Sequence, residues 1–246
     1  MTSAVASSST PTPVTLVGAT GLTGSRSLSS ILASSHPFNL TVLTRRSLPA
    51  ESAPPPANNS TTLQTRLYTD LFDAPTDGQK IAEQGGVYVS CLGTTRANAG
   101  GTAQQEKVDL HLNRDLAKRA KDDGASTMIL VSTSGASSAS RMFYPRIKGE
   151  LEDAVKEMGF EHAVILRPAA LLGPRNESRP AEYIMQSTFR GLRKLGLPLT
   201  SLCIDAEDVG ACIAHLAAHP PADKVVTLWD DEIIAFARKY REENSN

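Results

Sequence analysis

The feature that most constrains the fold is a glycine-rich turn near the start of the chain, which spans Val14 to Gly24 with the sequence VTLVGATGLTG. An apolar, β-branched run enters this turn, and apolar residues leave it at helical spacing, at Leu28, Ile31 and Leu32. The local order is therefore a strand, a tight turn and a helix. This order, with three glycines spaced three apart, is typical of a turn that binds the pyrophosphate of a dinucleotide.

Each glycine of the turn has its own expected role. Gly18 can adopt backbone angles that a side chain forbids, Gly21 lets the pyrophosphate approach the main chain, and Gly24 lets the helix pack tightly on the strand. Thr20 and Leu22 complete the cofactor-binding candidates of this segment. The start of the helix adds free N–H donors and the positive end of its dipole. The alternative is a glycine turn that serves only the packing of strand and helix.

Strand-like and helix-like segments alternate along the 246 residues. This alternation predicts one α/β domain, a doubly wound parallel sheet of the NAD(P)-binding Rossmann type, over residues 14–246. Residues 1–13 are rich in Ser, Thr and Pro, and we interpret them as a disordered tail. Further strands are expected at 40–44, 63–68, 87–92, 127–131, 162–166 and 225–228, and further helices at 105–121, 144–158, 181–195, 209–218 and 232–240. Residues 48–62 and 97–102 are expected to be flexible loops, and the C-terminal segments, the helix at 181–195 above all, to cover the cleft.

Composition excludes several other classes of protein. The net charge of −1 provides no electrostatic footprint for nucleic acid. Three cysteines, Cys91, Cys203 and Cys212, are odd in number and far apart, which favours a reducing compartment over a disulfide framework. No apolar run approaches the roughly 18 residues of a membrane span. His215 and His219 are four residues apart, but no cysteine or acid lies near them at ligand spacing, so no metal site is predicted.

The residues that follow the second and third expected strands indicate which cofactor is bound. In an NAD site this region usually carries an acid for the ribose 2′-hydroxyl, whereas a basic residue suits the 2′-phosphate of NADP. Here the second strand ends in Arg45 and Arg46, whose guanidinium groups can form paired, charge-assisted bonds to phosphate. We therefore predict NADP(H). The alternative is that Arg45 and Arg46 are solvent-exposed residues at a strand end with no role in binding. Asp70 and Leu71 follow the third strand, where the adenine would lie; a plain turn is the alternative for Asp70.

Three further cofactor contacts are expected at the ends of later strands. Gly93 and Thr94 follow the strand at 87–92, and Gly93 again permits a ligand to approach the backbone closely. Pro168 lies in the turn after the strand at 162–166. In enzymes of this fold that turn lies along the nicotinamide, although a packed apolar turn fits the sequence equally well.

The candidate catalytic residues follow the strand at 127–131. Ser132 ends that strand, and Tyr144 and Lys148 come later with the i, i+4 spacing that places two side chains on one helix face. An ammonium beside a phenol favours the phenolate, and a nearby hydroxyl can orient a carbonyl oxygen. Pro145 suits the first position of a helix and disfavours a helical predecessor, which would place Tyr144 at the helix edge. Ser134 is the alternative catalytic hydroxyl.

These motifs carry a family resemblance. The glycine turn and the Tyr144–Lys148 pair resemble an atypical short-chain dehydrogenase/reductase. More narrowly, the segments YPRIKGELE (144–152), LRP (166–168) and ESRP (177–180) resemble the Tat-interacting-protein family, and within it the fungal "found in mitochondrial proteome" branch. The resemblance implies a Rossmann fold, NADP(H), and peripheral attachment to the mitochondrial outer membrane on its cytosolic side, with the cytosol as the alternative. It does not supply a substrate.

The resulting prediction is an NADP-dependent oxidoreductase that reduces the carbonyl of a small molecule, or oxidises the alcohol. Tyr144 would give the proton to oxygen, Lys148 would tune Tyr144 and hold the nicotinamide ribose, and Ser132 would orient the carbonyl. The alternative from another class is a non-enzymatic NADPH-binding module, or an adaptor at the mitochondrial outer membrane. The residues leave the oligomeric state open.

Overall fold

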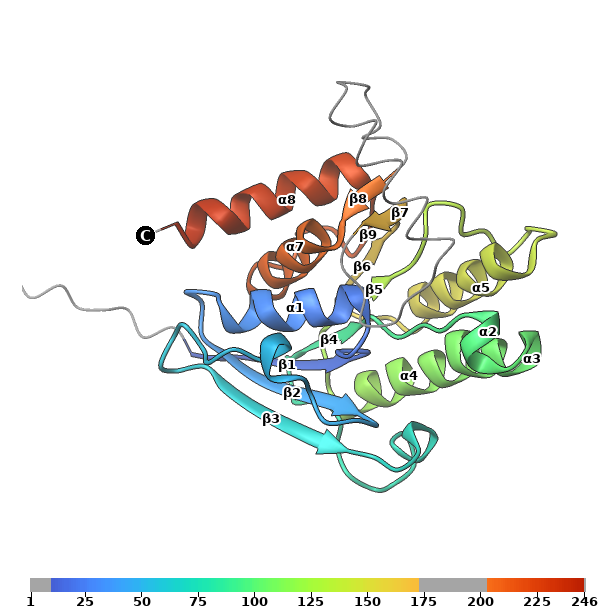
Figure 1. Cartoon of the computed structure of the whole chain (residues 1–246), viewed down its shortest axis with the longest axis horizontal. Coiled ribbons are helices and arrows are strands. Elements are labelled where there is room, and N and C mark those ends of the chain that lie inside the picture. The colour runs from blue at the N-terminus through green and yellow to red at the C-terminus, as the bar shows by residue number, and fades with distance from the viewer. Residues whose placement is uncertain (1–9, 173–202, 246) are drawn as a thin grey trace, which may run out of the picture.

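The computed structural model describes residues 10–172 and 203–245, and within them seven parallel strands form one sheet (Figure 1). The strand order is β3-β2-β1-β4-β5-β6-β9, so the predicted doubly wound fold is confirmed. The strands are β1 (Thr12–Val17), β2 (Phe38–Thr44), β3 (Thr62–Leu67), β4 (Val87–Ser90), β5 (Thr127–Val131), β6 (His162–Leu166) and β9 (Val225–Leu228).

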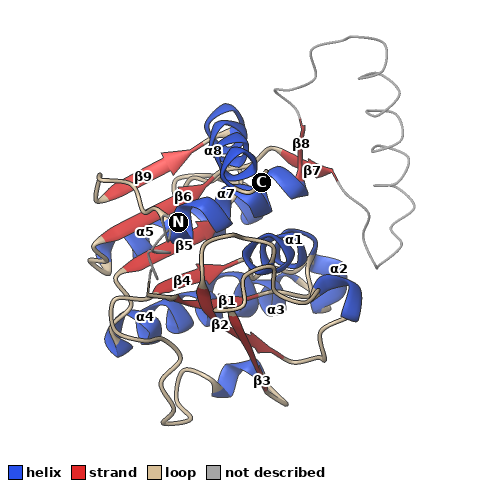
Figure 2. Cartoon of the chain, turned by 90° about the vertical axis from the view of Figure 1, so that its left-hand side faces the viewer, coloured by secondary structure: helices blue, strands red, loops and turns tan. Residues whose placement is uncertain are grey.

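Helices cover both faces of this sheet (Figure 2). One face carries α1 (Leu22–Leu32), α7 (Ala206–Ala218) and α8 (Asp230–Glu243); the other carries α4 (Asn113–Asp123) and α5 (Phe143–Glu157). The cause lies in the alternation of side chains along each strand. Leu16 and Val131 pack under the first group of helices, and their neighbours Val17 and Leu130 pack under the second. The central strands β4, β5 and β6 are buried along their length and largely apolar, whereas the edge strand β3 is polar and mostly exposed.

The order of the strands determines where a ligand can bind. From β1 the chain moves outward to β2 and β3, and then returns to the other side of β1 to form β4 and its successors. In such sheets the crevice lies outside the carboxyl ends of the strands, at the point where the order reverses. Here that point lies between β1 and β4, where the Cys91 amide donates to the Val17 carbonyl at 3.0 Å.

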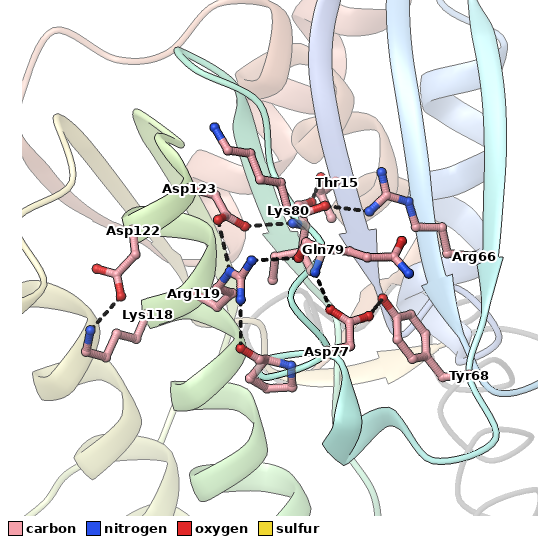
Figure 3. A network of polar contacts seen from close by, with 12 residues as sticks. Thr15, Arg66, Tyr68, Asp77, Gln79, Lys80, Lys118, Arg119, Asp122 and Asp123 are labelled. Carbon is pink, nitrogen blue, oxygen red and sulfur yellow. Dashed lines mark hydrogen bonds and ion pairs between the residues drawn. The ribbon is translucent and has the colours of Figure 1, made fainter.

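A polar network fixes the long connection between β3 and β4 (Figure 3). The Arg119 guanidinium on α4 donates to Asp123 at 2.9 Å and to the carbonyls of Pro75 and Gln79 at 3.1 and 2.7 Å. Asp123 in turn accepts from the Ile81 amide at 2.7 Å. These bonds hold the connection under α4 and so fix the direction in which the chain leaves β3.

Several local predictions were wrong. β1 begins at Thr12 instead of Val14, because Thr12 already pairs with Phe38 of β2. The expected loop at 48–62 contains a short 3-10 helix, η1 (Ala50–Ser52), and is held against α1: the Ser29 hydroxyl donates to the Ser52 carbonyl at 3.2 Å. The expected loop at 97–102 contains α2 (Arg96–Ala99), followed by α3 (Thr102–Glu106).

Two further features were not anticipated. The helix expected at 105–121 contains a π-helical segment, η3 (Lys107–Leu112), between α3 and α4. Two short strands, β7 (Ala170–Leu172) and β8 (Cys203–Asp205), pair in parallel as a separate small sheet. The predicted tail, for residues 1–9, and the predicted covering helix at 181–195 lie outside the described residues.

Candidate functional site

Two of the three glycines in the turn are required by packing. Gly18 has φ +83°, and a Cβ there would lie 2.5 Å from the Cys91 carbonyl carbon and oxygen. A Cβ at Gly24 would lie 2.1 Å from the Gly18 carbonyl oxygen. Gly21 differs, because its Cβ would meet only that same oxygen, at 3.3 Å. Packing among the described residues therefore leaves space at Gly21, where a ligand is expected.

The start of α1 is suited to an anion. Its N-cap is Gly21, with no side-chain cap bond, and its first turn holds no acid. The positive end of the helix is thus not neutralised by a side chain of the described residues. Thr20 is exposed and Leu22 half-buried on either side of Gly21. This is the arrangement that binds phosphate groups at helix N-termini.

The residues predicted for the adenosine end lie at the same edge of the sheet. Arg45 and Arg46 are exposed directly after β2, and the Thr44 hydroxyl bonds to the main chain of Arg46. Asp70 is exposed after β3 and caps a 3-10 helix, η2 (Leu71–Asp73), by accepting from the Phe72 amide at 3.1 Å. Leu71 is buried in the core, so its side chain is not available to a ligand.

Behind Gly93 and Thr94 lies a buried acid, Asp109, that sequence reasoning missed. The Thr94 amide donates to Asp109 at 2.7 Å, and Gln105 donates to both the Thr94 carbonyl and Asp109 at 3.3 Å. Burial raises the pKa of Asp109, and the nearby Lys148 charge opposes this shift. Asp109 lies in the π-helical segment η3, a type of distortion that is frequent at functional sites. This distortion is seen only in the structure, so no local sequence pattern pointed to Asp109.

The predicted pair, Tyr144 and Lys148, occupies one helix. α5 begins at Phe143 and includes both residues, and Pro145 is its third residue. A proline fits there because the first four N–H groups of a helix have no partner within it. Lys148 is 3% exposed, and its ammonium donates to the Val131 carbonyl at the end of β5, at 2.8 Å. Burial lowers the pKa of Lys148, and Asp109 and Glu152 oppose the shift. Tyr144 is 42% exposed.

The two candidate serines have different surroundings. Ser132 is buried, and its hydroxyl donates to Glu152 at 2.5 Å. Glu152 is also held by the Arg167 guanidinium through bonds of 2.6 to 3.2 Å. Ser134 is exposed, and its amide donates to the Pro168 carbonyl at 3.0 Å. The loop from β5 is thus tied to the turn after β6, where Pro168 was predicted to contact the cofactor.

Sequence reasoning also missed Glu152 and Gly149, although both follow the Tyr-x-x-x-Lys motif directly. A Cβ at Gly149 would lie 2.1 Å from the Ser138 amide nitrogen, so the glycine lets the loop after β5 lie directly on α5. Glu152 is one helical turn after Lys148. Glu152 follows Lys148 at the same i, i+4 spacing at which Lys148 follows Tyr144, and this spacing could have indicated that Glu152 shares their helix face.

The structure brings most of the predicted site together. The glycine turn, Gly93 and Ser132 follow adjacent parallel strands, and parallel strands present their carboxyl ends at one edge. Lys148 reaches the same edge through its bond to Val131. This arrangement can cradle a dinucleotide at the carboxyl edge of the sheet, where the Lys148 ammonium also lies.

Solved structures of low sequence identity share this fold. WbmF of Bordetella bronchiseptica in complex with NAD+ has a TM-score of 0.63 at 15% identity, covering 96% of this chain and 79% of that one. MoeE5 in complex with UDP-glucose and NAD has a TM-score of 0.62 at 16% identity, covering 92% and 81%. At such identities the likeness establishes the Rossmann-type fold alone.

Closer relatives come from fungi, while no family model matches the chain. The chain is 37% identical over 235 residues to "Protein fmp52, mitochondrial" of Aspergillus clavatus, covering 92% of this chain and 98% of the relative. It is 42% identical over 242 residues to "Protein fmp52-1, mitochondrial" of Aspergillus terreus, covering 92% and 99%. It is 37% identical over 228 residues to the Candida albicans protein of the same name, FMP52, covering 90% and 96%. The chain therefore belongs to the fungal Fmp52 family.

Proposed function

We propose that this protein is an NADPH-dependent oxidoreductase of the short-chain type, which reduces the carbonyl of a small molecule or oxidises the alcohol. The observation that carries the proposal is the placement of Tyr144 and Lys148 one turn apart on α5, with the Lys148 ammonium buried at the carboxyl end of β5. The space at Gly21 and the uncapped start of α1 support a dinucleotide there. Solved structures of the same fold that hold NAD are consistent with this class of cofactor.

The chain's own residues account for cofactor binding. The turn from Gly18 to Gly24, with Thr20, Gly21 and Leu22, would hold the pyrophosphate through main-chain N–H groups. Arg45 and Arg46 would bind the 2′-phosphate, which is the basis for proposing NADPH over NADH. When bound, the nicotinamide supplies the hydride. Gly93 and Thr94 would let the cofactor approach the end of β4.

Tyr144 and Lys148 would handle the proton. The Tyr144 hydroxyl donates its proton to the carbonyl oxygen as the alcohol forms, and the Lys148 charge stabilises the phenolate that remains. Lys148 is suited to this because its bond to Val131 fixes the ammonium, and because the acids Asp109 and Glu152 favour its charged form against burial.

We propose Ser134 as the hydroxyl that orients the carbonyl, in place of the initially favoured Ser132. The Ser132 hydroxyl donates its only proton to Glu152 and is buried, whereas Ser134 is exposed on the loop beside the Pro168 turn. Ser132 would then act on the site indirectly, by fixing Glu152 one turn from Lys148.

A second candidate function is a non-enzymatic NADPH-binding module or adaptor. It is favoured by the names of the relatives, which describe mitochondrial proteins and no reaction. Under either function we propose a mitochondrial location, peripheral to the outer membrane. None of the helices in the described ranges is long and apolar enough to cross a membrane. We also propose that the chain is related to the Tat-interacting-protein family, which its sequence motifs resemble.

The test compares Tyr144→Phe with Tyr240→Phe, which loses a hydroxyl bonded to the Ser30 carbonyl on the other side of the molecule. Both are assayed for NADPH oxidation with a panel of quinones, aldehydes and ketones, and for NADPH affinity by fluorescence. Tyr144→Phe should lower the rate by about 10²–10⁴ with affinity unchanged, because a positioned general acid contributes that much. Equal rates in Tyr144→Phe and wild type would exclude the proton-donor role, and NADPH binding by wild type without any turnover would favour the binding module.

A further inference from the structure

A second cluster of reactive side chains lies at the opposite edge of the sheet from the glycine turn. A cavity of about 350 Å³ lies where the end of α7 meets the end of α8 and the segment that leads into β2. His36, His215, His219 and Glu243 line it. The Thr12 hydroxyl, at the amino end of β1, bonds to His36 at 2.8 Å, which places the cavity at the amino ends of β1 and β2. α7 and α8 lie side by side on this face (Figure 1).

Three of these side chains converge on one point. His215 Nδ1 lies 3.0 Å from one carboxylate oxygen of Glu243, and His219 Nε2 lies 3.8 Å from the other. One ligand atom from each of the three residues can be chosen so that all lie within 4.8 Å of one another. The rings of His215 and His219 are 5.1 Å apart between centroids. His215 lies on α7, His219 directly follows its last residue, and Glu243 is the last residue of α8, 28 positions after His215.

This geometry is close to that of a zinc site. Zinc binds imidazole nitrogen and carboxylate oxygen at about 2.0–2.2 Å, which puts the ligand atoms of a tetrahedral site about 3.3 Å apart. The 3.0 Å separation from His215 and the 3.8 Å separation from His219 are to different oxygens of Glu243, and one ligand atom from each residue lies within 4.8 Å of the others, so His219 and Glu243 have to turn inward to reach that value. His215 is buried and held, while His219 and Glu243 are exposed enough to turn toward an ion. Two histidines and one carboxylate also leave a fourth position open, which water occupies in zinc sites of this composition.

We propose that His215, His219 and Glu243 bind a divalent transition-metal cation, with zinc the best fit to the ligand set. The ion ties the C-terminal end of α8 to the end of α7 and is independent of the dinucleotide site. From the sequence no metal site is predicted here, because neither a cysteine nor an acid lies near the two histidines at ligand spacing. Glu243 reaches them only because α8 packs along α7, which no local pattern reveals.

The test is zinc binding by the full chain, purified without a histidine tag and stripped with a chelator. Isothermal titration with ZnCl₂ should give one site per chain. His219→Gln and Glu243→Gln should each weaken binding by about tenfold or more, since each removes one of three ligands. Two matched controls should bind zinc as wild type does: His111→Gln, at an exposed histidine on the other face, and Glu242→Gln, at the exposed acid next to Glu243.

A second readout does not depend on affinity. Cobalt in place of zinc should give the strong visible absorption of a tetrahedral site in wild type and in both controls, and a weak spectrum in His219→Gln. NADPH affinity should be the same with and without zinc. The proposal is wrong if wild type binds no zinc beyond the level of the His219→Gln variant, or if Glu242→Gln weakens binding as much as Glu243→Gln does.

Discussion

The Glu152–Arg167 pair under α5 should be among the most sensitive polar contacts in the described structure. The Glu152 side chain is 1% exposed and that of Arg167 21%. The guanidinium donates to both carboxylate oxygens, at 2.6 to 3.2 Å. The carboxylate also accepts from the Ser132 hydroxyl at 2.5 Å, lies 3.9 Å from the Lys156 ammonium and interacts with the charge of the buried Lys148. Removing one partner of a buried pair costs about 3–5 kcal/mol, because it leaves an uncompensated buried charge. Since Ser132 and Lys156 remain, we expect Arg167→Met to lower the free energy of unfolding by about 3 kcal/mol.

Urea unfolding of the wild type and three variants tests this explanation. Arg146→Met is the matched control: Arg146 makes an equally short bond of 2.6 Å to Glu150, but both side chains are about one-third exposed, so the loss should stay below about 1 kcal/mol. Glu152→Gln with Arg167→Met should recover at least about 1 kcal/mol relative to Arg167→Met alone, because the double variant no longer buries a carboxylate that has lost its guanidinium partner. A double variant no more stable than Arg167→Met, or an Arg167→Met loss as small as that of Arg146→Met, would refute the reasoning.

Three further predictions concern the cofactor site. Arg45→Ala should weaken NADPH binding about tenfold or more and leave NADH binding unchanged in fluorescence titrations, because a charge-assisted bond contributes about 1.5–3 kcal/mol; equal losses for both cofactors would contradict the 2′-phosphate role. Gly21→Val should remain folded by circular dichroism yet lose both cofactors, whereas Gly24→Ala should unfold at a lower temperature, because its Cβ would lie 2.1 Å from a carbonyl oxygen; normal NADPH binding by folded Gly21→Val would mean that the phosphates bind elsewhere. Burial raises the pKa of Asp109, so the stability that this group contributes is present below its unfolded pKa and is lost as pH rises through its folded pKa. Asp109→Asn should therefore gain stability relative to wild type between pH 4 and pH 8 in urea unfolding, and a relative loss over that range would reverse the sign.

The central strands could be predicted from sequence because they are buried on both faces. The strands at 127–131, 162–166 and 225–228 have the predicted bounds, and the first two are mostly apolar runs that end in polar residues. β7 and β8 could not be predicted in this way, because three-residue strands have no periodicity to detect. The π-helical segment escaped because it depends on a contact with the loop after β4, where the Asp109 carboxylate accepts from the Thr94 amide. Asn113, the first residue of α4, donates to the Leu92 carbonyl of the same loop.

The candidate site was predictable in its positions but not in its contacts. Spacing along one helix was enough to pair Tyr144 with Lys148. It could not show that the Ser132 hydroxyl bonds to Glu152, because that bond depends on a rotamer and on two elements 20 residues apart. The same limit applies to Glu243, which meets its histidines only through the packing of α8 on α7.

The most direct test of the proposed reaction follows the hydride itself. The chain is incubated with NADPH deuterated at the transferable position of the nicotinamide, separately for each face, and with a panel of aldehydes and ketones. Mass spectrometry of the products should show one deuterium on the carbinol carbon, from one face only, at a rate that Tyr144→Phe lowers about 10²–10⁴-fold. If wild type saturated with NADPH transfers no deuterium to any carbonyl above the rate in buffer, the oxidoreductase proposal is contradicted and the binding module is favoured.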